Sequence, residues 1–255
     1  MKKIAIVTGA TGGLGREFIE LMRKESIDEI WAIARNEDKL DNLKKEIGNQ
    51  IVTISKDLAK REDIESIQTL LRAEKAQIVY LINNAGMGKM GHYDEFSMDE
   101  MEQMLDINCR AVITLSYLCI PYMKAGSRIL NISSQASFQP NPYLNLYAAT
   151  KAFVTSYSRA LHRELKESGI TVTAVCPGWV DTELLKKEWN GRRIKFPGIV
   201  EALPVAKKAL KDAKRGKDMS VYGAYVKCMQ VYSKLMPHRL IMNLWVKSID
   251  RYTNG

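Results

Sequence analysis

The 255-residue sequence has no apolar run of about 18 residues, the length that a helix needs to cross a bilayer. The uncharged stretch from Ala111 to Met123 is shorter and contains Pro121, so we expect a buried helix there. No signal peptide is recognised, because Lys2 and Lys3 lead directly into a strand pattern. We therefore expect neither a membrane-spanning protein nor a secreted one.

Cysteine is also scarce. The four cysteines, at positions 109, 119, 176 and 228, are scattered and show no spacing typical of a metal site. We expect reduced thiols in a cytoplasmic protein and no bound metal.

Acidic residues are outnumbered, 29 to 38, which leaves a net charge of +9. The basic residues are spread among the expected helices, and no nucleic-acid-binding motif is present, so we expect no nucleic-acid partner. A positive field would attract anionic substrates. The sequence has no internal repeat and no low-complexity segment, and its 46% apolar content fits one soluble domain.

The sequence does contain a regular alternation of strand and helix patterns, which predicts a doubly wound α/β fold with a parallel sheet and right-handed crossovers. We expect strands at 3–8, 29–34, 50–55, 77–83, 127–133, 171–176 and near 219–221. We expect helices at 13–24, 37–47, 62–74, 98–122, 146–168 and 204–215.

A glycine-rich turn follows the first expected strand, with Gly9, Gly12, Gly13 and Gly15 in seven residues. A strand, a glycine turn and a helix in this order are typical of a phosphate-binding loop. Glycines let the backbone approach a pyrophosphate, and the free N–H groups at the helix start bind the anion. A plain connection between a strand and a helix rarely needs four glycines.

A second motif combines Tyr147 and Lys151, which lie one helical turn apart and share a helix face. A lysine ammonium beside a phenol favours the phenolate, so we expect Lys151 to lower the pKa of Tyr147. Ser134 follows a predicted strand and is expected to reach the same pocket, whereas the neighbouring Ser133 points to the opposite side of the strand. A solvated helix face is the alternative for the Tyr-Lys pair alone.

Together, the two motifs resemble the short-chain dehydrogenase/reductase family, whose fingerprint is Thr-Gly-x-x-x-Gly-x-Gly followed by Ser and Tyr-x-x-x-Lys. The resemblance covers about residues 3–222. It implies a single Rossmann-type domain with strand order 3-2-1-4-5-6-7, helices on both faces, and a nicotinamide cofactor across the carboxyl ends of the strands. It also implies the catalytic set, which is Asn108, Ser134, Tyr147 and Lys151.

Further segments match the family in order. The resemblance implies cofactor contacts in the glycine turn, after the third and fourth strands, at the catalytic pair and after the sixth strand. These residues are Gly9, Thr11, Gly12, Gly13, Leu14, Gly15, Asp57, Leu58, Asn84, Ala85, Gly86, Tyr147, Lys151, Pro177, Gly178, Val180 and Thr182.

The end of the second strand indicates which nicotinamide cofactor binds. An acidic residue there would hold the ribose hydroxyls of NAD, but Asp28 and Glu29 precede the strand. Arg35 stands at the strand end and is placed to pair with a 2′-phosphate, with Arg16 as a second candidate. We therefore favour NADP(H) over NAD(H). A surface charge opening the next helix is the alternative for Arg35.

We expect an NADP(H)-dependent carbonyl reductase or alcohol dehydrogenase that acts on a small apolar ketone or secondary alcohol, such as a steroid or 3-oxoacyl compound. In reduction, Tyr147 would protonate the carbonyl oxygen, Ser134 would orient it, Lys151 would lower the tyrosine pKa and hold the nicotinamide ribose, and Asn108 would anchor a proton-relay water. Two alternatives are a non-catalytic NADP(H)-sensing regulator and a peripheral membrane-associated reductase.

Within the expected domain of residues 1–222, residues 183–203 lose the strand-helix rhythm and are expected to cover the substrate, with Trp189 and Phe196 as an apolar lid. Residues 223–255 form a C-terminal extension, and within the stretch 225–252 the apolar residues at 241, 244, 245 and 249 predict an amphipathic helix. That helix would pack on the domain or on a second copy, with membrane contact as the alternative. The long helices at 98–122 and 146–168 favour a homodimer or homotetramer.

Overall fold

The computed structural model describes residues 1–183, 185, 188–189, 192–193 and 196–253. Its centre is a seven-stranded parallel sheet in the order β3-β2-β1-β4-β5-β6-β9, which confirms the expected strand order. The strands are β1 Lys3–Thr8, β2 Glu29–Ala34, β3 Ile51–Ser55, β4 Gln77–Asn83, β5 Met123–Ile132, β6 Thr171–Val175 and β9 Met219–Ser220.

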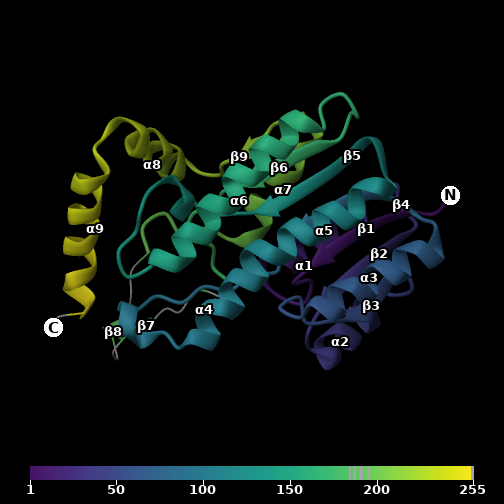
Figure 1. Cartoon of the computed structure of the whole chain (residues 1–255), viewed down its shortest axis with the longest axis horizontal. Helices are drawn as coiled ribbons and strands as arrows, with labels where there is room; N and C mark the ends of the chain where they lie inside the picture. The colour runs from purple at the N-terminus through teal and green to yellow at the C-terminus, as the bar shows by residue number, and fades with distance from the viewer. Residues whose placement is uncertain (184, 186–187, 190–191, 194–195, 254–255) are drawn as a thin grey trace.

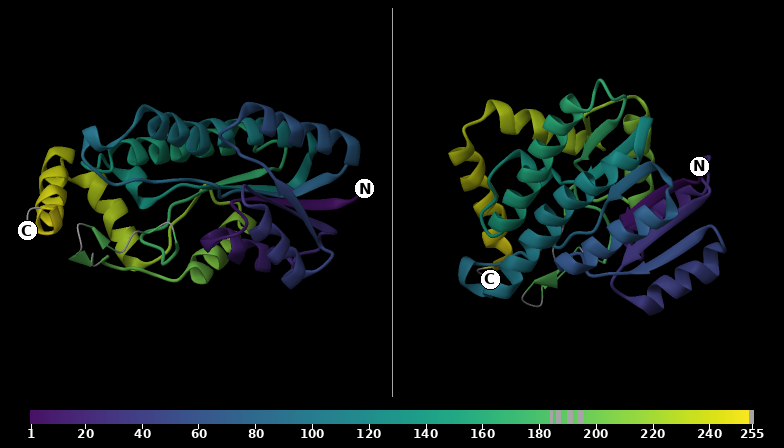
Figure 2. Two further views of the ribbon diagram at one scale, coloured as in Figure 1. Left: turned by 90° about the horizontal axis from the view of Figure 1, so that it is seen from below. Right: turned by 45° about the vertical axis from the view of Figure 1, so that its right-hand side comes forward.

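Helices cover both faces of the sheet (Figure 2). On one face pack α1 Gly13–Met22, α2 Glu37–Ile47 and α7 Ala202–Lys214, through side chains such as Phe18, Leu40 and Leu210. On the other face pack α3 Arg61–Glu74, α5 Ala111–Cys119 and α6 Asn145–Glu164, which bury Ile67, Leu115 and Leu161. The apolar strands are buried from both sides because helices cover both faces.

The helix expected over 98–122 is continuous but changes its winding. α4 Met98–Leu105 passes into a π-helical turn, Asp106–Arg110, and then into α5 and a 3₁₀ turn, Ile120–Tyr122. By length and mean hydropathy this run could span a bilayer, and 44% of its most apolar window is buried; the core helix of a soluble protein passes the same test. Here α5 packs on the sheet, so the run is a core helix of this domain.

The C-terminal extension contains the expected amphipathic helix and a second helix before it. It consists of α8 Ala224–Leu235 and α9 His238–Thr253. Pro237 separates them, because proline lacks an N–H and restricts the preceding residue, Met236, to an extended conformation. α9 stands at the end of the molecule opposite the N-terminus (Figure 1).

The other boundaries differ from the expectation by a few residues, with two larger exceptions. β5 begins four residues before the expected start at 127, and α6 ends at Glu164 rather than at 168. Between 183 and 203 the described residues include two short strands that pair antiparallel, β7 Glu188–Trp189 and β8 Arg192–Arg193. The expected lid residue Trp189 has its side chain outside the described part of the structure.

Candidate active site

The glycine turn is shaped by close backbone approaches. Gly9 and Gly13 have φ angles of 62° and 48°, in the left-handed region that favours glycine. A Cβ on Gly15 would lie 2.1 Å from the carbonyl oxygen of Gly9, so no other residue fits there. A Cβ on Gly12 would meet nothing within 4 Å, so this part of the turn is open. The turn leads into α1, in which Leu14 is buried.

Asn84 fixes this turn to the end of β4. Its side-chain Nδ2 donates to the carbonyl oxygens of Thr8 and Gly9, each at 3.1 Å. In return, the Thr8 hydroxyl oxygen accepts from the backbone N–H groups of Asn84 and Ala85 at 2.9 Å. The hydrogen bonds hold the carboxyl ends of β1 and β4 in one arrangement, at the position where doubly wound folds bind nucleotides.

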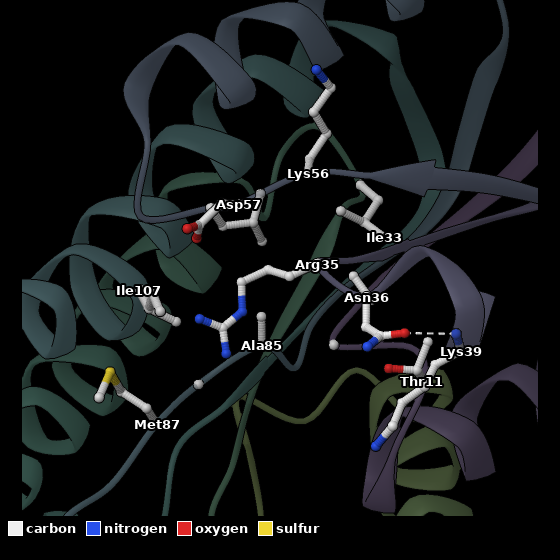
Figure 3. Close-up of a pocket in the computed structure, with 14 residues that line it drawn as sticks. Thr11, Ile33, Arg35, Asn36, Lys39, Lys56, Asp57, Ala85, Met87 and Ile107 are labelled. Carbon is white, nitrogen blue, oxygen red and sulfur yellow. Dashed lines mark hydrogen bonds between the residues drawn. The ribbon is translucent and has the colours of Figure 1, made fainter.

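A cavity of about 300 Å³ opens beside this turn (Figure 3). Seven residues singled out in the sequence line it: Gly9, Thr11, Arg35, Asp57, Leu58, Ala85 and Gly86. Seven others line it that the sequence did not single out: Ile33, Ala34, Asn36, Lys39, Lys56, Met87 and Ile107. Asn36 and Met87 follow strand ends, so the sequence could have indicated that they line the cavity. Ile107 lies in a helix that is distant in sequence, and only the fold brings it near.

Arg35 extends across this cavity, and its guanidinium lies near Ala85, Met87 and Ile107 (Figure 3). The side chain is exposed, and no carboxylate partner is recorded for it among the described residues. A fork of N–H donors in an open cavity suits a phosphate.

The other charges considered at the sequence level are engaged elsewhere. Asp28 accepts a hydrogen bond from the backbone N–H of Lys3, and Glu29 pairs with Lys2, both at the amino end of the sheet. Arg16 forms an ion pair with Glu46 on α2. Arg16 is therefore not directed to the cavity as Arg35 is.

Ser134, Tyr147 and Lys151 are brought together at the carboxyl end of β5. Ser134 follows β5 and caps the 3₁₀ turn Gln135–Phe138, with its hydroxyl oxygen accepting from the N–H of Ala136 at 3.1 Å. The Ser134 hydroxyl also lies close enough to the Tyr147 phenol to lower its pKa. Lys151 Nζ lies 5.6 Å from the centre of the Tyr147 ring. Gly88 packs on this ring, since a Cβ there would lie 2.9 Å from Tyr147 Cδ2.

The sequence predicted that the pKa of Tyr147 is lowered, but in the protein without its cofactor this pKa is raised. Burial raises the pKa of the Tyr147 phenol above its ordinary value, and the neighbouring Ser134 hydroxyl lowers it only in part. The pKa of Lys151 is lowered by burial to about 8. Its ammonium is 2.8 Å from the carbonyl oxygen of Ile132, to which it donates a hydrogen bond. Spacing placed the two groups together, but it could not reveal how little water reaches them.

Asn108 lies in the π-helical turn and is fully buried. Its amide forms hydrogen bonds to both backbone groups of Met87, at 3.0 Å and 2.9 Å, and donates to the Thr150 hydroxyl at 3.0 Å. It also lies near Lys151: a Cβ on Gly86 would be 3.2 Å from Asn108 Oδ1 and 3.4 Å from Lys151 Nζ. A π turn presents such a side chain at a functional site in many helices.

Ser133 is hydrogen-bonded to α6. Its hydroxyl donates to the carbonyl oxygen of Lys151 at 2.7 Å and contacts the Thr155 hydroxyl at 2.7 Å. It therefore holds α6 against β5.

The segment after β6 closes the site from the other side. The carbonyl oxygen of Pro177 accepts from the N–H of Gln135 at 2.7 Å, which ties the segment to the turn after Ser134. Gly178 faces Val226 of α8, and Val180 bridges to Val200. Thr182 reaches the glycine turn, where a Cβ on Gly13 would lie 2.8 Å from its methyl carbon.

Three aromatic rings stand next to this segment. Trp179 contacts Phe196, with ring centres 4.7 Å apart, and stacks on Trp245 of α9, with centres 6.5 Å apart. Trp245 Nε1 donates to the carbonyl oxygen of Pro142 at 2.8 Å. The C-terminal extension is thereby fastened to the loop that leads to Tyr147. Among the described residues, no group of three His, Cys, Asp or Glu side chains is placed to hold a metal ion.

This fold and site define an oxidoreductase that uses a nicotinamide nucleotide. Residues 3–193 match the family model for short chain dehydrogenases, and the chain belongs to that family of enzymes. The match with relatives agrees: the chain is 35% identical over 192 residues to a bovine protein called very-long-chain 3-oxoacyl-CoA reductase, covering 71% of this chain. The human protein of that name is 35% identical over 194 residues. The chain spans 61% of the length of these relatives.

Solved structures are similar over most of the chain. A short-chain dehydrogenase from Sphingobium yanoikuyae in complex with NADPH has a TM-score of 0.77 at 28% identity, with 92% of both chains covered. The bulky-bulky ketone specific alcohol dehydrogenase from Comamonas testosteroni has a TM-score of 0.72 at 25% identity, with 92% of this chain and 94% of the other covered.

Proposed function

We propose that this enzyme is an NADPH-dependent carbonyl reductase that acts on an apolar ketone, such as a steroid or a 3-oxoacyl compound. The observation that carries the proposal is the cluster at the carboxyl end of β5: the Tyr147 phenol beside the Ser134 hydroxyl, with the Lys151 ammonium 5.6 Å from the ring. A proton donor, a second hydrogen-bond donor and a cation in one pocket are what carbonyl reduction requires.

The residues present fit a dinucleotide. The close approach between Gly15 and Gly9, together with the open face at Gly12, leaves room for a pyrophosphate against the start of α1. We assign the remaining cofactor contacts as the sequence predicted them: Thr11, Gly13, Leu14, Asp57, Leu58, Asn84, Ala85, Gly86, Pro177, Gly178, Val180 and Thr182. When bound, the nicotinamide supplies the hydride for reduction.

The chain's own residues then handle the carbonyl oxygen. Tyr147 donates its proton to that oxygen, and its raised pKa keeps the phenol protonated at neutral pH. Ser134 donates a second hydrogen bond that orients the carbonyl. Lys151, charged below about pH 8, stabilises the phenolate that remains. Asn108 is held by the backbone of Met87, and its Oδ1 lies with Lys151 Nζ beside Gly86, where a relay water would bind.

Arg35 supports NADPH as the cofactor rather than NADH. The guanidinium lies in the cavity with Lys39 and Lys56 also on its lining, and the acidic residues near β2 are engaged at the other end of the sheet. Lys39 pairs with Glu183 and Lys56 pairs with Asp63, so the guanidinium of Arg35 is the charge that favours an added phosphate group.

Apolar side chains around Tyr147 support an apolar substrate. Met90 and Leu144 pack in the same cluster as the tyrosine, and the rings of Trp179, Phe196 and Trp245 stand at the neighbouring wall. The names of the relatives, a 3-oxoacyl-CoA reductase and a bulky ketone alcohol dehydrogenase, agree with ketones of this kind.

The proposal is tested by following nicotinamide absorbance with purified protein and a panel of ketones: steroids, 3-oxoacyl thioesters and small aromatic ketones. We expect oxidation of NADPH, faster than that of NADH, with at least one apolar ketone. A higher kcat/KM with NADH on every ketone would overturn the cofactor assignment. A preference for polar carbonyl compounds in a widened panel would overturn the substrate class.

We also propose that the protein is cytoplasmic and forms a homodimer or a homotetramer. α4, α5 and α6 carry exposed apolar side chains on the face away from the sheet, at Leu105, Ile113, Tyr117 and Phe153. A contiguous apolar surface on paired helices is typical of a contact between subunits.

A further inference from the structure

α9 has an outer face that the proposed reaction does not use. The inner face is buried through Ile241 and Ile249 and fastened by Trp245 to the carbonyl oxygen of Pro142. On the opposite side, Leu240 and Leu244 lie one turn apart and are 42% and 49% exposed. In Figures 1 and 2, no other described element lies outside α9 at this end of the molecule.

The outer face combines apolar and basic side chains. Lys247 follows Leu240 and Leu244 on the same stripe, because residues three and four apart are neighbours on a helix. Arg239 stands at the edge of the stripe, and Leu235, the last residue of α8 and 76% exposed, flanks the corner before Pro237. We call these five residues, Leu235, Arg239, Leu240, Leu244 and Lys247, the α9 face.

The charge of the C-terminal extension is mostly positive. Between residues 219 and 253 the sequence contains five lysines and arginines and one acidic residue, Asp250. Basic residues that border exposed leucines on a helix are the pattern of a helix that lies in a membrane interface. The leucines enter the acyl boundary, while the long basic side chains reach the headgroups.

We propose that the α9 face docks the protein on an anionic lipid bilayer surface. A second copy is a poorer occupant. A symmetric contact would place each patch on its equivalent and bring basic side chains together without an acidic partner. The exposed apolar residues of α4, α5 and α6 are a separate surface that suits a second copy. An acidic protein groove would satisfy the charges, but α9 protrudes from the end of the molecule, as a planar surface requires.

Docking would place the catalytic side toward the lipid. α9 contacts both Pro142, in the loop leading to Tyr147, and Trp179, in the segment after β6. An apolar ketone dissolved in the bilayer would then enter from the surface against which α9 lies. The docking proposal itself does not depend on the proposed reaction, because binding to lipid is measured without turnover.

The test is sedimentation of the full chain with vesicles of phosphatidylcholine alone or of phosphatidylcholine mixed with phosphatidylserine. We expect binding to the mixed vesicles that weakens as salt is raised. Arg239→Gln with Lys247→Gln should weaken it about 25-fold at low salt, at about fivefold per basic side chain. Leu240→Gln with Leu244→Gln should weaken it at least about tenfold.

Matched controls lie at the other end of the molecule. Leu70→Gln changes a leucine on α3 that is 40% exposed, and Lys44→Gln with Lys45→Gln removes two charges from α2. These variants should bind lipid as the wild type does. Circular dichroism and NADPH binding check that all variants fold.

A thiol label locates the contact independently. An environment-sensitive fluorophore on Asn243→Cys, in a Cys228→Ser background, should shift to the blue with mixed vesicles, and one on Lys45→Cys should not. The proposal is overturned if the wild type fails to bind mixed vesicles. It is also overturned if the control variants lose binding as much as the α9 variants do, or if Leu240→Gln with Leu244→Gln instead dissociates an oligomer.

Discussion

Lys151 and Tyr147 stand one turn apart on α6, with the lysine nitrogen 5.6 Å from the centre of the tyrosine ring. The ammonium is held by a 2.8 Å hydrogen bond to the carbonyl oxygen of Ile132 and is almost entirely buried. A buried charge destabilises the folded protein. This buried charge lies where the proposed reaction uses a cation.

The buried lysine predicts an unusual dependence of stability on pH. The pKa of Lys151 is lowered from 10.5 to about 8, so between these values the unfolded chain binds a proton that the folded chain does not. The free energy of unfolding should therefore rise with pH in this window, by about 3 kcal/mol from this group. Below pH 8 the full cost of the buried charge is present.

Lys151→Met isolates this contribution, because other groups titrate alike in both proteins. Between pH 7 and pH 10.5, we expect the free energy of unfolding of the wild type to rise by about 3 kcal/mol more than that of the variant. Urea unfolding measures both values. Unfolding free energies of the two proteins that run parallel over this range would show that Lys151 is not buried as a cation.

Arg35 should determine the choice of cofactor. Replacing it with serine removes the charged donors that we assign to the 2′-phosphate, so the ratio of kcat/KM for NADPH over NADH should fall about 10- to 100-fold. Lys56→Gln is the matched control, because Lys56 also lines the cavity but pairs with Asp63. An equal fall in the control would assign the preference to general charge rather than to Arg35.

Asn108 should be needed for stability as well as for the site. Asn108→Ala leaves the buried N–H of Met87 and the Thr150 hydroxyl without this partner, so the free energy of unfolding should drop by about 3 kcal/mol. Asn42→Ala, at an exposed position of α2, should cause no loss. Equal unfolding midpoints in urea for wild type and Asn108→Ala would contradict the hydrogen-bond network described here.

Tyr117 should be central to the proposed dimer. Its side chain is 74% exposed on α5, so Tyr117→Glu places a charge in the contact without disturbing the core. We expect the mass measured by sedimentation equilibrium to fall to that of one chain. Tyr93→Glu, which changes a tyrosine that is 72% exposed, should leave the mass unchanged. A monomeric wild type would rule the dimer out.

Much of the fold could be predicted because its signals are local. The apolar strand of Ile4 to Val7, the glycine turn and the alternation of strands with helices each depend on neighbouring residues. The resemblance to the family then supplied the strand order, which the sheet confirms.

The remaining features depend on contacts between distant segments. The π turn at Asn108 is held by hydrogen bonds to Met87 and Thr150, and no periodicity reveals them. The burial that raises the pKa of Tyr147 likewise comes from the packed site. The division between α8 and α9 is different, because Pro237 was a usable signal in the sequence.

The central claim is that Tyr147 supplies the proton in a reductase reaction. The most direct test compares wild type and Tyr147→Phe by nicotinamide absorbance, with the best ketone of the panel, and measures NADPH binding by fluorescence. We predict that Tyr147→Phe binds NADPH as the wild type does and that kcat falls by about 10²- to 10⁴-fold. Substantial turnover by Tyr147→Phe would contradict the account, and NADPH binding without turnover of any ketone by the wild type would favour a cofactor-sensing role instead.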